Sequence, residues 1–391
     1  MSTALPLAGI RIIEMAGVGP GPFCGMMLAD HGAEVIRIDR AGGLQAGVPI
    51  DGGRDVMLRS RRSISLDLKS PAAVGIVKRL ALRSDGLIEG FRPGVMERLG
   101  LGPDALMQIN PSLVYGRMTG WGQTGPMADM PGHDINYIAL AGVLDAIGPA
   151  GGKPVPPLNL VGDYGGGGLM LAFGMVTALL AVRAGSPGRV IDCAMTEGAS
   201  LLMAGTWTLI ANGWTSTGRG TGLLDGGAPF YDTYETADGG YVALGAIEGK
   251  FFERLRTLME LDDDPDFAEQ YDQARWPAMR STLSHLFRQK TLAFWQGLLE
   301  HEDVCFAPVM SAGQAPAHPH NAARGAFIEA EGIIQPAPAP RLSGTPAQPP
   351  KMWRENSDKA TILAELGFSE SEVKALEQAG AFGHAPRGAC S

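Results

Sequence analysis

Residues 10–39 read IRIIEMAGVGPGPFCGMMLADHGAEVIRID, and this stretch decides the fold class. Ile10 to Glu14 predicts a strand, Phe23 to His31 predicts a helix, and Glu34 to Asp39 predicts a second strand. A strand, a helix and a strand in this order form a βαβ unit, in which the two strands run parallel. The stretch therefore predicts an open, mainly parallel sheet that is covered by helices.

The same alternation of short apolar runs and helical segments continues to about residue 120. Three further runs predict strands: Ser63 to Leu68, Gly86 to Glu89 and Leu113 to Met118. A helix is predicted from Ser70-Pro71 to Leu82, because serine favours the capping position and proline the first helical position. The first part of the chain is therefore predicted to be an α/β domain with a Rossmann-like sheet.

Changes in composition mark a second part of the chain. Glycine and threonine dominate Ala211 to Gly227, which predicts a linker, and residues 228 to about 300 are typical of a smaller α+β unit. This unit begins with a predicted hairpin, Phe230 to Leu244, around the turn Asp238-Gly239-Gly240. The predicted C-terminal elements are an extended proline-rich strap at 334–350 and helical segments near 361–366 and 369–380.

The composition of the 391 residues is that of a globular protein, with 45% hydrophobic and 19% charged residues. The formal net charge of −9 argues against a nucleic-acid-binding protein. The four cysteines are isolated in the sequence, so they predict neither a zinc site nor a disulfide framework and fit a reducing compartment.

Targeting and membrane signals are not expected in this sequence. The first ten residues lack the basic and apolar regions of a signal peptide, and Ala389-Cys390-Ser391 is neither the usual peroxisomal tripeptide nor a prenylation box. The most apolar run, Leu169 to Val182, is predicted to be too short to span a bilayer. We therefore expect a cytoplasmic location.

The glycine-rich turn at Gly17 to Pro22 does not fit a dinucleotide-binding fingerprint. Pro22 stands where the fingerprint requires its third glycine, and Pro20 removes a backbone N–H that a pyrophosphate would use. The sequence also contains no Walker loop. A nicotinamide or nucleoside triphosphate site is therefore not expected.

A cluster of cations between residues 54 and 69 is a better candidate for an anion site. This stretch contains five cations and two carboxylates. The cations are Arg54, Arg59, Arg61, Arg62 and Lys69, and the carboxylates are Asp55 and Asp67. Arg92 and Arg98 follow within and after a Gly-Phe-Arg-Pro-Gly-Val run. Guanidinium groups bind phosphate in a bidentate manner, and coenzyme A would supply three phosphates. The alternative is that single arginines of this set are solvated surface charges.

Two short segments about thirty residues apart each place one titratable side chain before an apolar helical stretch. The first, Gly132 to Tyr137, carries His133; the second, Asn159 to Tyr164, carries Asp163 before Gly165 to Gly168. An imidazole and a carboxylate on opposite sides of one carbon can remove a proton from one face and return it on the other, which inverts a stereocentre. Taken singly, each residue is also explained as a helix cap, and the histidine also as a core partner.

The order of these motifs resembles the α-methylacyl-CoA racemases, especially the bacterial members, of the class III (family III) CoA-transferase superfamily. The resemblance extends over nearly the whole chain. It is carried by 7–11, 17–22, 32–39, 65–69, 92–94, 120–126, the two segments around His133 and Asp163, 224–229, 231–235 and 245–248.

The resemblance implies roles for three side chains and the position of a CoA site. His133 matches the base for one enantiomer, Asp163 matches the base for the other, and Glu248 matches a carboxylate that orients the histidine from the partner subunit. The implied substrate and CoA contacts are Arg40, Leu66, Lys69, Gly90, Phe91, Arg92, Pro93, Gly94, Val95, Arg98, Gly132, Asp134, Ile135, Asn136 and Tyr137.

The resemblance also implies an interlocked homodimer, in which each active site lies between the large domain of one subunit and the small domain of the other. The expected divisions are a large CoA-binding domain at 1–190, a linker helix or loop at 191–224, a small domain at 225–300, a returning linker at 301–335, and a strap with helices at 336–391 that pack on the large domain.

The expected reaction is interconversion of 2R and 2S 2-methylacyl-CoA thioesters by two bases through an enolate. No metal or redox cofactor is expected, since CoA is part of the substrate. The enolate oxygen needs hydrogen-bond donors, and we expect them at a helix start opened by Gly165 to Gly168 or at Asp163 itself.

Two alternative functions and the identity of the acyl chain stay open at this point. One alternative is a class III CoA-transferase with Asp163 as the nucleophile, and the other is a non-catalytic acyl-CoA-binding protein. His133 favours the racemase, because a transferase needs no second base there. At the acyl surface that the resemblance implies, Met195, Met203 and Trp207 keep the site apolar but less adaptable than the methionine-rich surface of relatives. A branched fatty acid, a steroid side chain and an arylpropionyl group all stay open.

Overall fold

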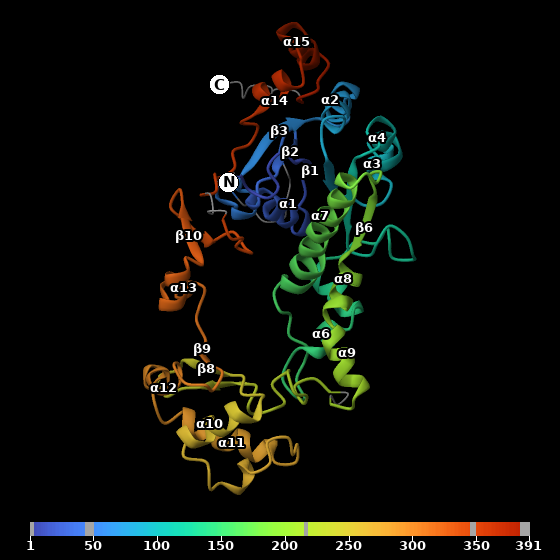
Figure 1. Ribbon diagram of the computed structural model, residues 1–391. Helices are drawn as coiled ribbons and strands as arrows, with labels where there is room; N and C mark the ends of the chain where they lie inside the picture. The colour runs from blue at the N-terminus through green and yellow to red at the C-terminus, as the bar shows by residue number, and fades with distance from the viewer. Residues whose placement is uncertain (1–3, 44–50, 215–217, 345–348, 384–391) are drawn as a thin grey trace, which may run out of the picture. The chain divides into compact units, whose positions relative to one another are not determined.

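The computed structural model describes residues 4–43, 51–214, 218–344 and 349–383 (Figure 1). The chain forms two compact units. Unit 1 has the bounds Met1–Ala141, Leu158–Leu202 and Ala323–Ser391, and unit 2 has the bounds Gly142–Pro157 and Met203–Ala322. The C-terminal tripeptide and parts of the expected linker and strap lie outside the described residues.

Unit 1 contains a six-stranded sheet in which all the strand pairs are parallel. The strand order is β3-β2-β1-β4-β5-β6, which is that of a doubly wound Rossmann-type sheet. The strands are β1 (Arg11–Met15), β2 (Glu34–Arg40), β3 (Arg61–Leu66), β4 (Gly86–Glu89), β5 (Val114–Thr119) and β6 (Val190–Ala194). The predicted open, mainly parallel sheet is thereby confirmed.

Helices cover both faces of this sheet, since neighbouring strand residues point to opposite sides. Ile13 packs into one core cluster with α2, α4 and α14, whereas Ile12 packs into a second cluster with α1 and α7. The helices of unit 1 are α1 (Pro20–Asp30), α2 (Pro71–Ala81), α3 (Val95–Arg98), α4 (Pro103–Ile109), α5 (Asp134–Leu140), α7 (Met170–Arg183), α8 (Met195–Leu202), α14 (Lys359–Glu365) and α15 (Glu370–Gln378), with the 3-10 turns η1 (Gly52–Arg54) and η2 (Val56–Leu58).

The glycine run Gly165 to Gly168 lies inside a helix and does not open one. Residues Leu160–Leu169 form a π-helix, η3, that continues directly into α7. The glycines allow close packing: a Cβ on Gly166 would lie 2.5 Å from the backbone nitrogen of Ala199, and one on Gly168 would lie 2.7 Å from the backbone oxygen of Pro20. The expectation that this run exposes N–H groups to an oxyanion is therefore wrong, because its backbone is packed against α8 and α1.

The continuous helix of η3 and α7 is also longer than the sequence indicated. Leu160–Arg183 has the length and composition of a membrane-crossing helix, and 44% of its most apolar 18-residue window is buried inside the protein. Its contacts are with α1, α5, α8 and strands β5 and β6. These are the contacts of a core helix that covers a sheet, and a core helix passes the same test of length and composition.

Unit 2 is built on a three-stranded antiparallel sheet of β7 (Thr233–Glu235), β8 (Tyr241–Leu244) and β9 (Phe306–Pro308). The predicted hairpin is present, and Asp238 fixes its turn by accepting hydrogen bonds from the Thr236 hydroxyl and the Leu292 backbone. The helices are α6 (Val143–Ala146), α9 (Ala204–Ala211), α10 (Gly249–Leu258), α11 (Trp276–Phe287) and α12 (Leu292–Leu299), with 3-10 turns η4 (Pro265–Phe267) and η5 (Ala315–Ala317). The hydrophobic core of unit 2 includes Phe230, Phe252 and Phe287.

The chain returns from unit 2 to unit 1 through α13 (Pro319–Arg324). The hairpin of β10 (Phe327–Ala330) and β11 (Ile333–Pro336) follows, so the start of the expected proline-rich strap is a strand. Ile362 and Leu363 of α14 join the core cluster of β3 and α2. Residues 142–157 belong to unit 2, which differs from the expected large domain of 1–190.

Candidate active site

The candidate site lies at the carboxyl ends of the parallel strands in unit 1. In a sheet of this order, the strand sequence reverses between β1 and β4, and ligands bind in the crevice at that point. The loop after β1 leads through Gly19 into α1, and the loop after β4 begins with Gly90. Both loops therefore belong to the edge of the sheet at which a ligand is expected.

His133 is the N-cap residue of α5 and is exposed. Its backbone N–H donates to Oδ1 of Asn136 at 3.0 Å, which fixes the start of the helix. The aromatic ring of Tyr137 packs closely enough that a Cβ on Gly132 would lie 2.7 Å from it. The imidazole is exposed at this helix start, so it can meet a substrate or an orienting group.

Asp163 lies in η3 and is half-buried. Its Oδ2 accepts a hydrogen bond from Nδ2 of Asn159 at 3.0 Å, and its backbone N–H donates to Oδ1 of Asp134 at 2.8 Å. The loop before α1 approaches the same carboxylate, since a Cβ on Gly19 would lie 3.1 Å from Oδ2. Glycine at position 19 adopts a φ of +71°, which L side chains rarely adopt, so this close approach needs glycine.

The hydrogen bond from the Asp163 backbone to Asp134 brings Asp163 to the segment that carries His133. Burial raises the pKa of the Asp163 carboxyl above its ordinary value, and the negative charge of Asp134 raises it further. The hydrogen bond from Asn159 and the charge of the His133 imidazole act in the opposite direction and lower this pKa. A raised pKa makes the carboxylate a stronger base than an exposed aspartate.

Glu248 belongs to unit 2, where it is the exposed N-cap residue of α10. Its backbone oxygen accepts hydrogen bonds from the N–H groups of Phe251 and Phe252. Burial raises the pKa of the neighbouring Cys305 thiol, and the negative charge of Glu248 contributes to the rise. The expected contact of this carboxylate with His133 stays a prediction.

The residues expected to contact CoA follow the ends of the strands of unit 1. Arg40 ends β2, Gly90 to Val95 follow β4, and Gly132 to Tyr137 lead into α5. Lys69 and Arg98 line a common pocket of about 560 Å³ together with Lys78, Leu68, Pro71, Val74, Gly75 and Leu99. The three cations of this pocket, next to its apolar side chains, suit an anion that is attached to a flat ring. The sequence did not indicate Lys78 as a candidate for this site, because Lys78 lies inside a helix and no motif surrounds it.

Leu66, Asp134 and Tyr137 differ from the other expected CoA contacts, because their side chains are buried. Leu66 has no exposed surface and belongs to the core cluster between the sheet and α2. The Asp134 side chain is 5% exposed and faces the backbone of Asp163. A side-chain contact with CoA is therefore excluded for Leu66, which is a core residue.

Most of the predicted arginine cluster is unavailable to an anion. Arg61 is buried and donates to Oε2 of Glu14 at 3.0 Å and to the backbone oxygen of Pro22. Arg59 is buried against Asp30, with Nε 3.0 Å from Oδ1. Arg62 pairs with Glu34 and Glu365. The expectation of an anion site at this cluster is wrong for these three arginines, because their charges are compensated by carboxylates far away in the sequence.

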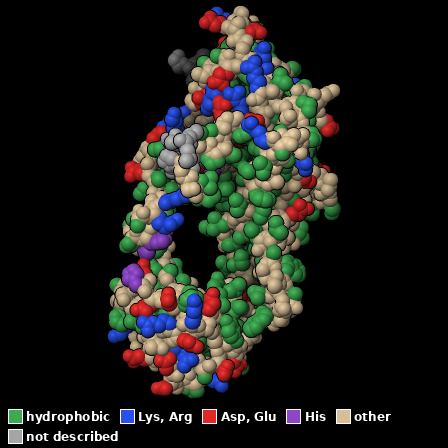
Figure 2. All heavy atoms as spheres, viewed as in Figure 1, with side chains coloured by type: hydrophobic (Ala, Val, Ile, Leu, Met, Phe, Trp, Pro, Cys, Tyr) green, Lys and Arg blue, Asp and Glu red, His purple; other side chains and the backbone are tan. Residues whose placement is uncertain are grey.

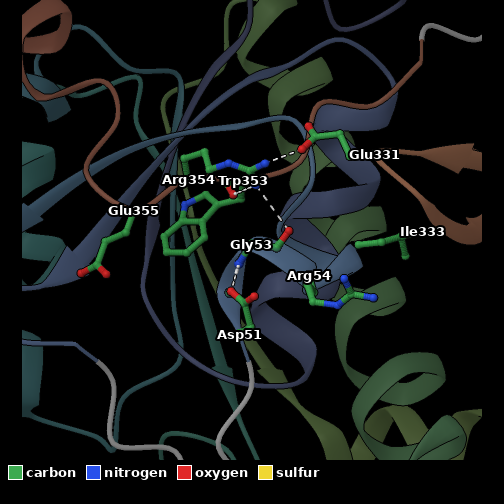
Figure 3. Close-up of a pocket in the computed structure, with 9 residues that line it drawn as sticks. Asp51, Gly53, Arg54, Glu331, Ile333, Trp353, Arg354 and Glu355 are labelled. Atoms are coloured by element: carbon green, nitrogen blue, oxygen red, sulfur yellow. Dashed lines mark hydrogen bonds and ion pairs between the residues drawn. The ribbon is translucent and has the colours of Figure 1, made fainter.

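Arg54 lines a different pocket, of about 470 Å³, with Trp353 and Arg354 (Figure 3). The remaining charged residues of this pocket are Asp51, Glu331 and Glu355. Arg354 pairs with Glu331, and the backbone N–H of Gly53 donates to Asp51 at 2.9 Å. The pocket therefore carries charges of both signs, in contrast to the cationic pocket at Lys69.

Apolar side chains cover an exposed face of unit 1 formed by α7 and α8 (Figure 2). Phe173 and Leu180 of α7 are 71% and 70% exposed, and Leu201 of α8 is 62% exposed. Met195, which was expected on the acyl surface, is buried. Trp207 is 62% exposed on α9 of unit 2.

No sequence motif indicated Asn159 as the hydrogen-bond partner of Asp163. This residue precedes Asp163 by four positions and is the N-cap residue of η3, so its amide lies on the same side of the helix as the carboxylate. The spacing would have indicated the contact if the helix had been predicted to start at Leu160 rather than behind the glycines. No cluster of three or more His, Cys, Asp or Glu side chains that could hold a metal ion is present among the described residues.

Comparison with known proteins places these residues in a family context. The family model described as CoA-transferase family III matches residues 7–354. The α-methylacyl-CoA racemase of Mus musculus is 44% identical over 373 residues, which cover 95% of this chain and 96% of that protein. The α-methylacyl-CoA racemase of Homo sapiens is 43% identical over 377 residues, with 95% and 96% covered.

A solved structure shows the same fold. The crystal structure of a CAIB/BAIF family protein from Brucella suis superposes with a TM-score of 0.80 at 26% sequence identity. The match covers 93% of this chain and 100% of the other.

Proposed function

The chain belongs to CoA-transferase family III, and from this premise we propose that it racemises α-methylacyl-CoA thioesters. The observation that carries the proposal is the hydrogen bond that joins the segments of His133 and Asp163 through Asp134, in a chain 43–44% identical to two α-methylacyl-CoA racemases. An imidazole and a carboxylate are the two bases that a 1,1-proton transfer needs. The enzyme is thus an isomerase that interconverts the 2R and 2S thioesters.

In the proposed mechanism, one base removes the α-proton and the other returns a proton on the opposite face. When Asp163 removes the proton, the electron pair of the C–H bond passes into the thioester to form an enolate, and protonated His133 supplies the new α-hydrogen. In the reverse direction the two residues exchange roles. The raised pKa of Asp163 favours this chemistry, because a stronger carboxylate base lowers the cost of taking a weakly acidic proton.

The enolate oxygen needs stabilisation by dipoles that already point at it. Because the glycine run lies inside η3, we assign this role to the backbone N–H of Gly21, which lies between Pro20 and Pro22 in the first turn of α1; this turn approaches Asp163 through Gly19. The N-terminus of an eleven-residue helix carries a partial positive charge. No further cofactor takes part in the proposed reaction, because CoA arrives with the substrate.

We propose that Arg40, Lys69, Arg92 and Arg98 bind the phosphates of CoA. All four side chains are exposed, and Lys69 and Arg98 share the cationic pocket with Lys78. Phosphate binds such cations through charge-assisted hydrogen bonds. The apolar residues Leu68, Pro71, Val74 and Leu99 of the same pocket would contact the adenine ring.

The proposed active unit is a homodimer located in the cytoplasm. Two observations support the dimer: α7 and α8 expose an apolar face, and the His133 imidazole is exposed at the start of α5. A second copy would cover the apolar face, and its Glu248 would orient the imidazole. Each active site then combines unit 1 of one subunit with unit 2 of the other.

A CoA-transferase is the second candidate function. In that mechanism Asp163 attacks an acyl-CoA, expels the CoA thiolate and forms an anhydride. The thiolate then attacks the Asp163 carbonyl to form an aspartyl-CoA thioester and release the donor acid. The acceptor acid attacks this thioester to form a second anhydride, and the released CoA thiolate takes the new acyl group and frees Asp163. This candidate fits less well, because it leaves His133 without a role and the relatives at 43–44% identity are racemases.

Deuterium exchange tests the proposal and separates it from the alternative. Pure (2R)- or (2S)-2-methylacyl-CoA in deuterated water should acquire one α-deuterium and yield both epimers. The panel should include branched fatty acyl, steroid side-chain and 2-arylpropionyl esters. A lack of exchange across this panel, together with transfer of CoA to a carboxylic acid and trapping of an Asp163 acyl adduct by hydroxylamine, would establish the transferase instead.

A further inference from the structure

We propose that Asp134, at the N-terminus of α5, is a positioning residue. It holds the backbone of Asp163 and places a negative charge beside the Asp163 carboxylate. The inference rests on the proposed function, since it concerns one of the two bases of that reaction. It differs from the role implied by the family resemblance, in which Asp134 contacts CoA.

A hydrogen bond joins the two catalytic segments. Oδ1 of Asp134 accepts from the backbone N–H of Asp163 at 2.8 Å. This N–H lies in the first turn of η3, where backbone donors have no partner within the helix. Because Asp134 directly follows His133, one side chain ties the segment that carries the imidazole to the segment that carries the carboxylate.

The packing around Asp134 leaves this contact little freedom. A Cβ on Gly162 would lie 2.4 Å from Oδ1 of Asp134, so the backbone before Asp163 passes directly against the carboxylate. Ile138, one turn further along α5, closes the other side, 3.2 Å from the same Cβ position. The geometry therefore requires glycine at position 162, and it fixes η3 against α5.

The second oxygen of Asp134 argues against a purely structural role. Oδ2 is buried, and it has no hydrogen-bond partner among the residues that the structure describes. A buried carboxylate oxygen without a partner destabilises a protein, so an asparagine or serine would satisfy the same N–H at lower cost. A charge kept at this position is expected where it acts on a neighbouring group.

The neighbouring group is Asp163. The charge of Asp134 contributes to the raised pKa of Asp163, next to burial, which is the larger cause. His133 and Tyr137 are the other titratable groups coupled to this carboxylate. Tyr164 lies on η3 itself. The remaining titratable side chains on elements packed against η3 are Cys24 and Asp30 on α1, Arg183 on α7, Glu197 on α8, Tyr115 and Arg117 on β5, and Asp192 and Cys193 on β6.

These contacts predict that Asp134 affects the two directions of the reaction unequally. The base strength and position of Asp163 depend on Asp134 directly, whereas the backbone of His133 is held by Asn136. A change at Asp134 should therefore alter proton abstraction by Asp163 much more than abstraction by His133.

The experiment uses Asp134→Asn and Asp134→Ala in the full-length protein, each combined with His133→Ala or Asp163→Ala to isolate one base. Deuterium wash-in to each pure epimer is measured over pH. Asp134→Ala should reduce exchange by Asp163 about 100-fold, since a misplaced base loses rate steeply. Asp134→Asn keeps an acceptor oxygen and should lose about tenfold or less, with the acidic limb of the Asp163 profile moved to lower pH. Exchange by His133 should change by less than about threefold in Asp134→Asn.

Asp104→Asn is the matched control, because Asp104 is an exposed acid in the first turn of α4. It should leave both profiles unchanged. An acidic limb at the wild-type pH in Asp134→Asn, or an equal loss for both bases, would overturn the proposal.

A measurement without turnover separates this proposal from the proposed function. Difference infrared spectroscopy of wild type minus Asp163→Asn titrates the Asp163 carboxyl in the free protein. The titration should move to lower pH in the Asp134→Asn background, and an unmoved titration would overturn the role of Asp134. A wild-type protein without exchange would overturn the racemase proposal, and the infrared titration would still decide the role of Asp134.

Discussion

At the scale of single residues, the chemistry of the site depends on the surroundings of one carboxylate. Asp163 is half-buried, which raises its pKa, and it receives a hydrogen bond from Asn159, which lowers it. Burial and this hydrogen bond therefore act on the pKa of Asp163 in opposite directions. The sequence indicated Asp163 and His133 as a pair, but it could not indicate Asn159 or Asp134 as their partners, because those contacts depend on where η3 begins.

The first prediction concerns Asn159. Asn159→Ala removes a hydrogen bond that favours the charged form of Asp163, so the pKa of this carboxyl should rise further. Because Asp163 acts as a base only when ionised, the acidic limb of its exchange profile should move to higher pH. Each unit of movement lowers the rate below the limb about tenfold. A pH profile of deuterium wash-in in the His133→Ala background measures this, and a limb that stays in place contradicts the assignment.

The second prediction concerns Glu248. Glu248→Gln leaves both bases present but removes the charge proposed to orient and support the imidazole. Exchange by His133 should fall about tenfold, whereas exchange by Asp163 should stay near the wild-type rate. Wash-in to each pure epimer shows the difference. Equal rates for wild type and variant with both epimers would remove Glu248 from the proposed site.

At the scale of elements, the strands were the most predictable part of the molecule. β4 begins and ends at the predicted residues, and β1, β2, β3 and β5 lie within two residues of the predicted bounds. Their enrichment in apolar, β-branched residues follows from burial on both faces of a parallel sheet. The π-helix was not predictable in this way, since four consecutive glycines are typical of a loop and only the packing of α8 and α1 against them makes a helix possible.

The third prediction tests this packing. Gly166→Ala places a Cβ 2.5 Å from the backbone of α8, so the contact must open and the free energy of unfolding should fall by about 1–3 kcal/mol. Gly75→Ala in α2 is the control, because nothing lies within 4 Å of its Cβ position. That variant should be more stable by about 0.5–1 kcal/mol. Thermal unfolding compares the two, and a Gly166→Ala protein as stable as wild type would contradict the close contact.

At the scale of the whole molecule, the parallel sheet and the second unit followed from the sequence, but the ionic pairs did not. Arg59, Arg61 and Arg62 were expected to bind an anion, and each pairs instead with a carboxylate on another element. A local count of charges cannot find such partners, because Glu14 and Glu365 lie 47 and 303 residues away from the arginines that they bind. The distribution of charge on the surface is therefore a property of the fold.

The fourth prediction concerns assembly. The apolar face of α7 and α8 should be covered by a second copy, so the protein should sediment at twice the mass of one chain. Phe173→Asp places a charge on this face and should shift the population toward the monomer, with loss of exchange by His133. Leu82→Asp, on an exposed apolar residue at the end of α2, is the control and should remain dimeric. A monomeric wild type with full racemase activity would contradict the proposed assembly.

The central claim is that His133 and Asp163 act on opposite faces of one α-carbon, and single-turnover exchange tests it most directly. His133→Ala and Asp163→Ala are each mixed with each pure epimer in deuterated water, and α-deuterium is measured before steady state is reached. His133→Ala should nearly abolish exchange of one epimer and leave slow exchange of the other with retention, and Asp163→Ala should show the reverse preference. Equal loss for both epimers in both folded variants would contradict the two-base account.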